Sequence, residues 1–469
     1  MTEWRQKRFW QILLLGAVLN RLSLFNALRS GELWLDEQWS LLLVQQAATP
    51  WELITKVRHD NNHLLNSLWM STLGPYAPPE LYRLPASLLA LLSIVATWLV
   101  ARWAGFGLAG IVWTLLVTVS YPLVVLTTEA RGYSWAVCAA IVSFGLLVAL
   151  RRKDARLGEA ALFLVVSSIG LLSHATYLLF LVPALAWLLV ERRREFLGLV
   201  SCVAVYAPLC VAGLLWSSFY GKLEIGGGPL APLIQVLVST ISIAYGGEEM
   251  SAFDVEGSVA ALGIACAVAV MLTVELVAWL RSKDPVAWLV AGVIACPLVV
   301  VVVTQPPFVM PRYFLLSVLF SYLVAARFVA RLTSQGTIGY LVSLSLTALF
   351  MVGNQRHTAE LARNGRSQLE RAVKAIVSTD EPLTVGGDMD NQNKIRLDYM
   401  RLRRDALGET SYVVDYDKNA PKVVLREWVE RGAKPEQTFV TSSGHTYELI
   451  QAYPAPLLSG STLAVYSRR

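Results

Sequence analysis

Long apolar runs alternate with short polar segments along the chain from Trp10 to Val352. A run of about 17 to 25 apolar residues is long enough to cross a bilayer as a helix. The runs are apolar all round, which indicates helices that face lipid or the inside of a bundle. The pattern predicts about eleven membrane-spanning helices, near Trp10–Ala27, Leu81–Ala101, Leu108–Tyr121, Tyr133–Leu150, Ala160–Leu172, Tyr177–Val190, Phe196–Trp216, Val259–Leu280, Val286–Val303, Tyr313–Val329 and Thr337–Val352.

The pattern changes after residue 353. Charged residues make up 32 of the 116 residues from 354 to 469, but only 42 of the 353 residues before them. Short segments of strand-like and helix-like pattern alternate in this tail, which predicts a small α/β domain. The expected elements are helices over Gln355–Val377, Asn391–Arg404 and Lys422–Glu430, and strands over Leu383–Val385, Tyr412–Val414, Thr438–Val440 and Thr462–Tyr466.

The predicted fold class is therefore a polytopic α-helical membrane protein with a small C-terminal α/β domain. We expect a membrane domain over residues 1–353 and a soluble domain over residues 354–469. Hydrophobic residues make up 55% of the chain and charged residues only 16%. This composition excludes a soluble enzyme, because a water-soluble core of this size cannot hide so much apolar surface.

The charge of the loops predicts the orientation in the membrane. Loops on the side of the N-terminus, such as 151–156 and 192–194, are denser in Lys and Arg than the longer loops on the other side. The positive-inside rule therefore places the N-terminus in the cytoplasm, and an odd number of spans places the C-terminal domain outside. Reading Ala160–Val190 as one helix would reverse the placement of the tail. The chain has no Asn-X-Ser/Thr sequon, which fits a bacterial inner (plasma) membrane.

The positions of the cysteines and the net charge limit which cofactors and partners the protein can have. All five cysteines fall inside apolar runs, so the sequence offers no disulfide framework and no zinc-ligand spacing. The net charge of +6 comes from basic clusters between the spans, which predicts no nucleic-acid partner. No Gly-rich phosphate loop follows a strand, so we predict no nucleotide cofactor. The sequence does not decide whether the protein binds a divalent metal ion.

Polar side chains collect where the spans end on the outer side. Asp36 and Glu37 follow the first span and lie between Trp34 and Trp39. A half-desolvated carboxylate at this depth can accept a proton from an incoming hydroxyl. The alternative is that both residues are solvated loop acids or helix caps.

A second cluster in the same loop contains Arg58, His59 and His63. These side chains suit contacts to a phosphate or a sugar. The histidine spacing also fits a metal pair on one helix face, but no neighbouring carboxylate or third histidine completes such a motif. We therefore expect substrate contacts here.

Three further outer positions carry polar residues: Glu129 with Arg131, His174, and Arg312 with Tyr313. Each of them alone is better explained as a structural anchor at the membrane interface. Together with the first loop they form one mixed-charge surface at the depth of a lipid phosphate. Its arginines can neutralise a leaving phosphate while Asp36 acts as a base.

The order of these short motifs resembles that of the GT-C glycosyltransferases, and more narrowly the bacterial relatives of protein O-mannosyltransferases and of the lipid A aminoarabinose transferase. The resemblance covers most of residues 1–330 and is strongest over 30–135. Its motifs are Leu35-Asp36-Glu37, Asn62-His63-Leu64-Leu65, Tyr82-Arg83-Leu84-Pro85, Glu129-Ala130-Arg131-Gly132-Tyr133, Ser173-His174-Ala175-Thr176 and Pro311-Arg312-Tyr313-Phe314. Protein mannosyltransferases usually carry His-Pro-Pro in the first loop, so the two leucines after His63 argue against protein mannosylation.

The resemblance implies inverting transfer of a sugar from a polyprenyl-phosphate carrier to an envelope acceptor on the external face. In that comparison Asp36 is the candidate base and Glu37 its neighbour in a shaping or acceptor-binding role. The donor phosphate would be held by Arg131, Arg312 and Tyr313. Supporting contacts would come from Glu129, His63 and His174.

Two other classes of function fit the same surface. A transporter or flippase of lipid-linked sugars would need polar residues near the bilayer midplane, and the predicted spans are almost free of them. A non-catalytic protein that docks glycolipids would tolerate loss of the Asp36 carboxylate. The acceptor, whether lipid, polysaccharide or protein, stays open.

Overall fold

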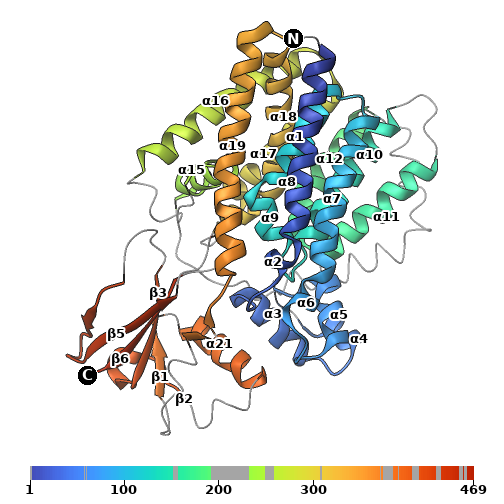
Figure 1. Cartoon of the computed structure of the whole chain (residues 1–469). Helices are drawn as coiled ribbons and strands as arrows, with labels where there is room; N and C mark the ends of the chain where they lie inside the picture. The colour runs from blue at the N-terminus through green and yellow to red at the C-terminus, as the bar shows by residue number, and fades with distance from the viewer. Residues whose placement is uncertain are drawn as a thin grey trace.

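The computed structural model describes residues 3–57, 59, 61–151, 157–191, 232–248, 258–306, 309–369, 371–372, 384–388, 390–403, 411–428, 435–453, 458 and 462–469. Figure 1 shows a bundle of long helices joined to a smaller domain that contains the C-terminus. A group of short helices lies beside that domain at the same end of the bundle.

The bundle contains a helix at every predicted span that falls within the described residues. The predicted span Phe196–Trp216 lies outside them. The observed helices are α1 (Glu3–Ser23), α7 (Leu84–Trp103), α8 (Gly107–Val119), α10 (Tyr133–Leu150), α11 (Leu157–Ser173), α12 (Leu178–Glu191), α16 (Val259–Arg281), α17 (Pro285–Thr304), α18 (Leu315–Thr333) and α19 (Gly336–Asn364). The segment Ala160–Val190 thus forms two helices, joined by the 3-10 turn η1 (Ala175–Tyr177).

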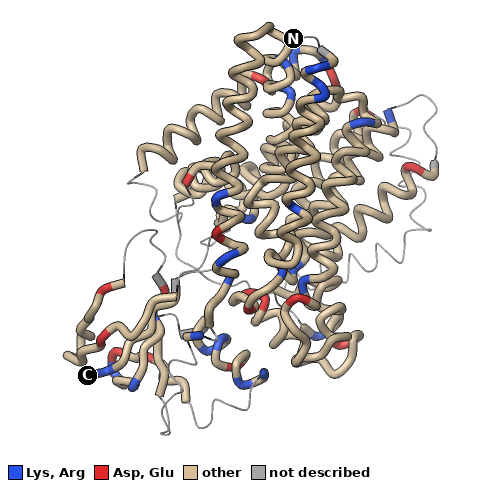
Figure 2. Tube along the Cα trace, viewed as in Figure 1, with Lys and Arg blue, Asp and Glu red and all other residues tan. Residues whose placement is uncertain are grey.

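Six helices of the described part are long and apolar enough to cross a membrane, and the pair α8 and α9 (Tyr121–Thr127) can count as a seventh span bent by 56°. Charged residues gather at the two ends of the bundle and on the smaller domain (Figure 2). The sequence pattern missed one helix of the bundle, α15 (Leu233–Ala244).

The break between α8 and α9 has a local cause. The Ser120 hydroxyl accepts a hydrogen bond from the Leu123 N–H at 3.4 Å, and Pro122 occupies the first turn of α9. The Tyr121 N–H donates to Asn354 Oδ1 of α19 at 2.6 Å, so it leaves the helical ladder. The break directs the carboxyl end of α9, and with it residues 128–131, toward the first loop.

The first predicted loop is largely helical. It contains α2 (Phe25–Arg29), α3 (Leu35–Gln45), α4 (Pro50–Thr55), α5 (Leu64–Leu73) and α6 (Pro79–Tyr82). Helix α4 begins with the Thr49 side chain accepting from the Glu52 N–H and with a proline in its first turn, a common start signal. These helices form a small unit that presents the amino end of α3.

The C-terminal domain is a mixed α/β unit, as predicted. Its sheet has the strand order β2-β1-β3-β6-β5-β4. Strand β1 is parallel to β2 and β3, whereas the pairs β3–β6, β6–β5 and β5–β4 are antiparallel. The elements are β1 (Thr384–Gly387), α21 (Asp390–Arg403), β2 (Ser411–Tyr412), α22 (Tyr416–Asn419), β3 (Val423–Trp428), β4 (Thr438–Val440), β5 (Thr446–Tyr453) and β6 (Thr462–Arg468).

Two predicted helices of this domain are wrong. The helix expected over Gln355–Val377 is the last part of α19 and ends at Asn364, where Gly365 has a positive φ. The segment Lys422–Glu430 was expected to be a helix, but Val423–Trp428 is the strand β3 between β1 and β6. Val424 and Leu425 are consecutive and both fully buried, so the two faces of the strand are covered. Burial on both faces removes the alternating pattern by which a strand is recognised. Strand β5 was also missed.

The C-terminal domain packs directly on the helices of the first loop. One hydrophobic cluster joins Leu41 and Val44 of α3 to Leu397 and Met400 of α21. The Arg403 guanidinium donates to the carbonyl of Ala77 at 2.9 Å. The domain therefore packs against and supports α3, the helix that carries Asp36 and Glu37.

Candidate active site

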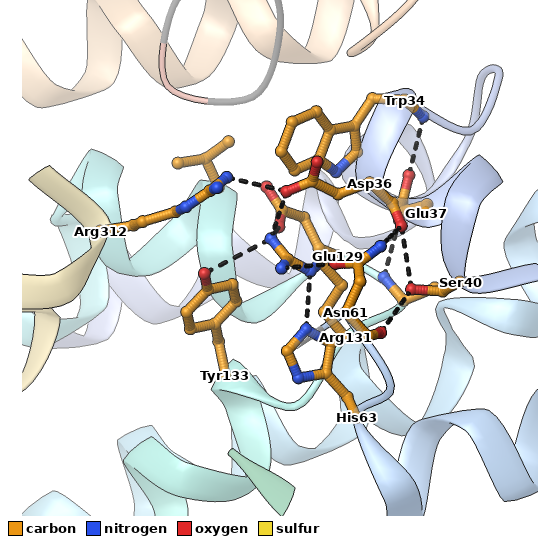
Figure 3. A network of polar contacts seen from close by, with 12 residues as sticks. Trp34, Asp36, Glu37, Ser40, Asn61, His63, Glu129, Arg131, Tyr133 and Arg312 are labelled. Atoms are coloured by element: carbon orange, nitrogen blue, oxygen red, sulfur yellow. Dashed lines mark hydrogen bonds and ion pairs between the residues drawn. The ribbon is translucent and has the colours of Figure 1, made fainter. Parts of the chain in front are cut away.

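Asp36 lies in the first turn of α3, at the centre of a charged cluster. Its Oδ2 lies 2.8 Å from an Nη1 atom of Arg131 and 2.8 Å from an Nη1 atom of Arg312. Figure 3 shows Asp36 between the two arginines. Its backbone carbonyl accepts from Asn61 Nδ2 at 2.6 Å and from the Ser40 hydroxyl at 2.9 Å. The other carboxylate oxygen, Oδ1, makes no hydrogen bond with the described residues, so it is the oxygen free to meet a substrate.

Arg131 is held in one orientation by contacts around its whole guanidinium. Its Nε donates to His63 Nε2 at 3.0 Å, and its Nη2 donates to Asn61 Oδ1 at 2.8 Å. The guanidinium carbon also lies 5.7 Å from the ring of Trp34 and 5.0 Å from that of Tyr133, within cation–π range. A planar donor fork fixed in this way suits a carboxylate or a phosphate.

His63 and His174 are buried side by side, with parallel rings 4.6 Å apart. Burial, followed by the nearby charge of Arg131, holds the pKa of each imidazole well below its ordinary value. Both are therefore neutral at physiological pH, and their partners fix the tautomers. His63 Nε2 accepts from Arg131 and His174 Nδ1 accepts from the Thr176 N–H, so the protons sit on His63 Nδ1 and His174 Nε2.

Four buried donors around this cluster lack an acceptor among the described residues. They are Trp34 Nε1, His63 Nδ1, His174 Nε2 and Arg312 Nε. Buried polar groups are normally hydrogen-bonded, and an unmet donor costs about 1–3 kcal/mol. The surplus of donors and positive charge suits a ligand that is anionic and rich in oxygen atoms.

Glu37 has a different environment from its neighbour. Its side chain is fully buried and pairs with Arg83, with an Oε2–Nη2 distance of 2.5 Å. It also accepts from the backbone N–H groups of Trp34 and Ala130. Burial alone would raise the pKa of Glu37, but the charge and hydrogen bonds of Arg83 lower it overall. Both oxygens accept from protein donors, so Glu37 has no oxygen free for an acceptor in this structure.

Glu129 is the one carboxyl group of the cluster without a hydrogen bond among the described residues. Both its oxygens are buried and unpartnered, and Arg131 Nη1 lies 3.9 Å from Oε2. Burial raises the pKa of Glu129 to about 8, an effect that Arg131 and Arg366 partly oppose. The side chain is therefore mostly protonated at neutral pH.

This environment predicts a pH-dependent stability. The folded protein binds a proton at Glu129 that the unfolded chain, with a pKa of 4.5, releases. The contribution of Glu129 to stability should therefore fall as pH rises toward 8, with a slope of about 1 kcal/mol per pH unit near pH 7.5. We expect Glu129→Gln to flatten this slope in thermal unfolding of the purified protein. A mutant slope equal to that of wild type would contradict the assignment.

The structure thus brings together most of the residues singled out in the sequence. One cluster contains Asp36, His63, Glu129, Arg131, His174 and Arg312. Tyr313 is half-buried in the 3-10 turn η3 (Pro311–Phe314) and packs with Phe314 and Val309. His59 lies next to the cluster, with its ring 4.1 Å from that of Trp39 and its Nδ1 accepting from the Asn61 N–H. Arg58 lies outside the described residues.

Sequence reasoning missed one buried arginine near the site, Arg366. It follows α19 in a stretch that was read only as a basic helix of the tail. Its guanidinium donates to the carbonyls of Leu28 and Val125 and to the Thr128 hydroxyl. A single arginine among many in a charged segment carries no sequence signal for this role. Within the described residues, no group of three or more potential metal ligands lies together.

Comparison with known proteins identifies the fold. No family model and no curated protein matches the sequence. By structure, the chain has the GT-C fold of membrane glycosyltransferases, which confirms the expected fold class and resemblance. It is a multi-pass membrane protein.

Two solved structures illustrate the match. ArnT from Cupriavidus metallidurans in the apo state is 12% identical, with 98% of each chain covered and a TM-score of 0.50. The archaeal oligosaccharyltransferase AglB from Archaeoglobus fulgidus, in complex with an inhibitory peptide and a dolichol-phosphate, is 9% identical. That match covers 91% of this chain and 70% of AglB, also with a TM-score of 0.50. At these identities the likeness establishes the fold.

Proposed function

We propose that the protein is an inverting glycosyltransferase that moves a sugar from a polyprenyl-phosphate carrier to a hydroxyl of an envelope acceptor. The observation that carries this proposal is the contact of two arginines with one oxygen of Asp36. The arrangement places a carboxylate base beside two fixed cations, the two charges that displacement of a phosphate from a sugar needs. The AglB structure, which contains a dolichol-phosphate, supports a lipid-linked donor.

In the proposed reaction the acceptor oxygen attacks the anomeric carbon of the donor sugar. The bond from that carbon to the phosphate oxygen breaks, and the acceptor proton passes to Asp36. The polyprenyl phosphate leaves with its charge neutralised by Arg131 and Arg312. A single displacement of this kind inverts the anomeric configuration, because the nucleophile enters opposite the leaving group.

The same contacts favour an order of binding. Without donor, Arg131 and Arg312 both bind Asp36 and so stabilise it as an unreactive carboxylate. A donor phosphate competes for the same guanidinium groups. Donor binding would therefore weaken the hold on Asp36 and prepare it to accept a proton, so we expect the donor to bind before the acceptor.

The apolar side chains beside Arg312 suit contact with the isoprenoid part of the donor. They line a small recess and include Pro122, Leu126, Ile243 and Leu315. An arginine at the rim of an apolar recess allows a phosphate to bind while the attached chain stays out of water. Lipid and phosphate sites would then be continuous.

The orientation belongs to the proposal as well. We propose a cytoplasmic N-terminus, with the active site and the domain of residues 354–469 on the outer face of a bacterial inner membrane. The basic residues Arg5, Lys7 and Arg8 lie near the start of α1, at the end of the bundle opposite α3 (Figure 1), which supports this placement. The sugar and the acceptor class are left to experiment.

Donor binding provides a direct test. We expect Arg312→Gln to weaken binding of a fluorescent polyprenyl phosphate to the purified protein in nanodiscs by about ten- to a hundredfold, the loss of one charged hydrogen bond. The matched control is Arg151→Gln, which removes an arginine paired with Asp284 elsewhere in the bundle and should leave binding unchanged. Equal affinities of wild type and Arg312→Gln would contradict the proposed phosphate site.

A further inference from the structure

Arg366 makes contacts unlike those of the other arginines in the segment that leads to the C-terminal domain. Helix α19 ends at Asn364, and Gly365, with φ +69°, turns the chain. A positive φ of this kind is easily adopted only by glycine. The turn directs Arg366 into the protein, where the side chain is 1% exposed, whereas Arg363, one turn earlier, is exposed.

The Arg366 guanidinium bridges two helices that are far apart in the sequence. Its Nη1 donates to the carbonyl of Leu28 in α2 at 2.7 Å. Its Nη2 donates to the carbonyl of Val125 in α9 at 3.0 Å and to the Thr128 hydroxyl at 2.5 Å. The last carbonyls of a helix have no partner within that helix, and a cation there is favourable. Arg366 therefore caps α2 and α9 together.

Both capped helices lead directly into the active site. Helix α2 ends at Arg29, seven residues before Asp36, and α9 ends at Thr127, four residues before Arg131. The two segments after them must meet so that Asp36 and Arg131 lie 2.8 Å apart. One rigid donor fork that holds both helix ends fixes the relative position of the two segments.

We propose that Arg366 is a positioning residue that aligns Asp36 with Arg131 by capping α2 and α9 from the segment between the bundle and the C-terminal domain. Its contacts are with protein atoms, so it acts through the two capped segments and has no direct part in the chemistry. Lysine cannot replace it, because a single ammonium lacks the planar fork that reaches both helices.

The charge of Arg366 adds an electrostatic effect. It is one of the cations that lower the pKa of Glu129, beside Arg131, while burial and the charges of Glu37 and Asp36 raise it. Loss of Arg366 should therefore move the titration of Glu129 to higher pH. A residue that only filled space would leave that titration unchanged.

The kinetic test rests on the proposed function. We expect Arg366→Ala to lower kcat for sugar transfer about a hundredfold, the scale of a misplacement of about 1 Å, with a much smaller change in the donor KM. Arg366→Lys should recover little activity. Added guanidinium ion should restore part of the activity of Arg366→Ala by filling the vacated site, but none in Asp36→Asn. The matched control Arg363→Ala should behave as wild type.

A second readout is independent of transfer. Hydrogen exchange of the full-length protein should become faster in both segments, 28–37 and 125–131, in Arg366→Ala and unchanged in Arg363→Ala. Faster exchange in both segments supports the positioning role, whether or not a sugar donor is consumed. A failure to consume any donor would count against the proposed function but not against the positioning role. Unchanged exchange in either segment, or transfer by Arg366→Ala within twofold of wild type, overturns the positioning role.

Discussion

Replacing Asp36 with asparagine should reduce sugar transfer by about 10² to 10⁴, the contribution typical of a general base. The same substitution should strengthen binding of the polyprenyl phosphate. Asparagine keeps the size of the side chain but removes the charge that Arg131 and Arg312 contact. Both guanidinium groups are then free for the donor phosphate. Opposite effects on turnover and on donor binding are the signature of this site.

The measurements are single-turnover transfer and equilibrium donor binding on the same preparation. Glu52→Gln is the matched control, because Glu52 is an acid of the same loop that pairs with the exposed Lys56 and lies outside the Asp36 cluster. It should leave both quantities unchanged. If Asp36→Asn binds donor more weakly than wild type, the arginines do not exchange between Asp36 and the phosphate. If it transfers sugar at the wild-type rate, Asp36 is not the base.

Loss of Arg83 should be among the most destabilising single changes in the chain. Its side chain is fully buried and donates to both carboxylate oxygens of Glu37. It also donates to the backbone carbonyls of four consecutive residues, Arg29, Ser30, Gly31 and Glu32. Breaking a buried ion pair from one side typically costs about 3–5 kcal/mol, because the remaining charge stays buried without a partner. Arg83→Met should therefore lower the unfolding temperature strongly.

The double variant Glu37→Leu with Arg83→Met separates the ion pair from the backbone contacts. It removes both charges, so it should be more stable than Arg83→Met alone. The four carbonyls still lack their donor, and the N–H groups of Trp34 and Ala130 lose their acceptor. The control is Arg102→Met, an exposed arginine at the other end of α7. Thermal unfolding in detergent measures all four proteins. A double variant no more stable than Arg83→Met would contradict a stabilising Glu37–Arg83 pair.

The spans could be predicted from the sequence because the bilayer imposes long runs of apolar residues on each of them. The short helices α3 to α6 could not, since they pack partly on the C-terminal domain and lack the length and periodicity of a span. The strand β3 was mistaken for a helix because it is buried on both faces. These failures occur where contacts from distant parts of the chain decide the local structure.

The candidate site, too, could be predicted from the sequence only in part. Asp36 and Glu37 are adjacent carboxylates, and the sequence alone does not separate their roles. On a helix, neighbouring residues point about 100° apart. Here that difference turns Asp36 toward Arg131 and Arg312, and Glu37 toward Arg83 in the interior. The contribution of Arg366 depends on a turn at Gly365 and on two distant helices, so it becomes visible only in three dimensions.

The central claim is transfer of a sugar from a polyprenyl phosphate with Asp36 as the base. The most direct test supplies a panel of radiolabelled polyprenyl-phosphate sugars to membranes that contain wild type or Asp36→Asn at equal expression. Lipid, polysaccharide and protein fractions are then counted, with and without a metal chelator. We predict that wild type moves label from one donor into one fraction, and that Asp36→Asn does not. No consumption of any donor by wild type, or equal transfer by the mutant, would contradict the account.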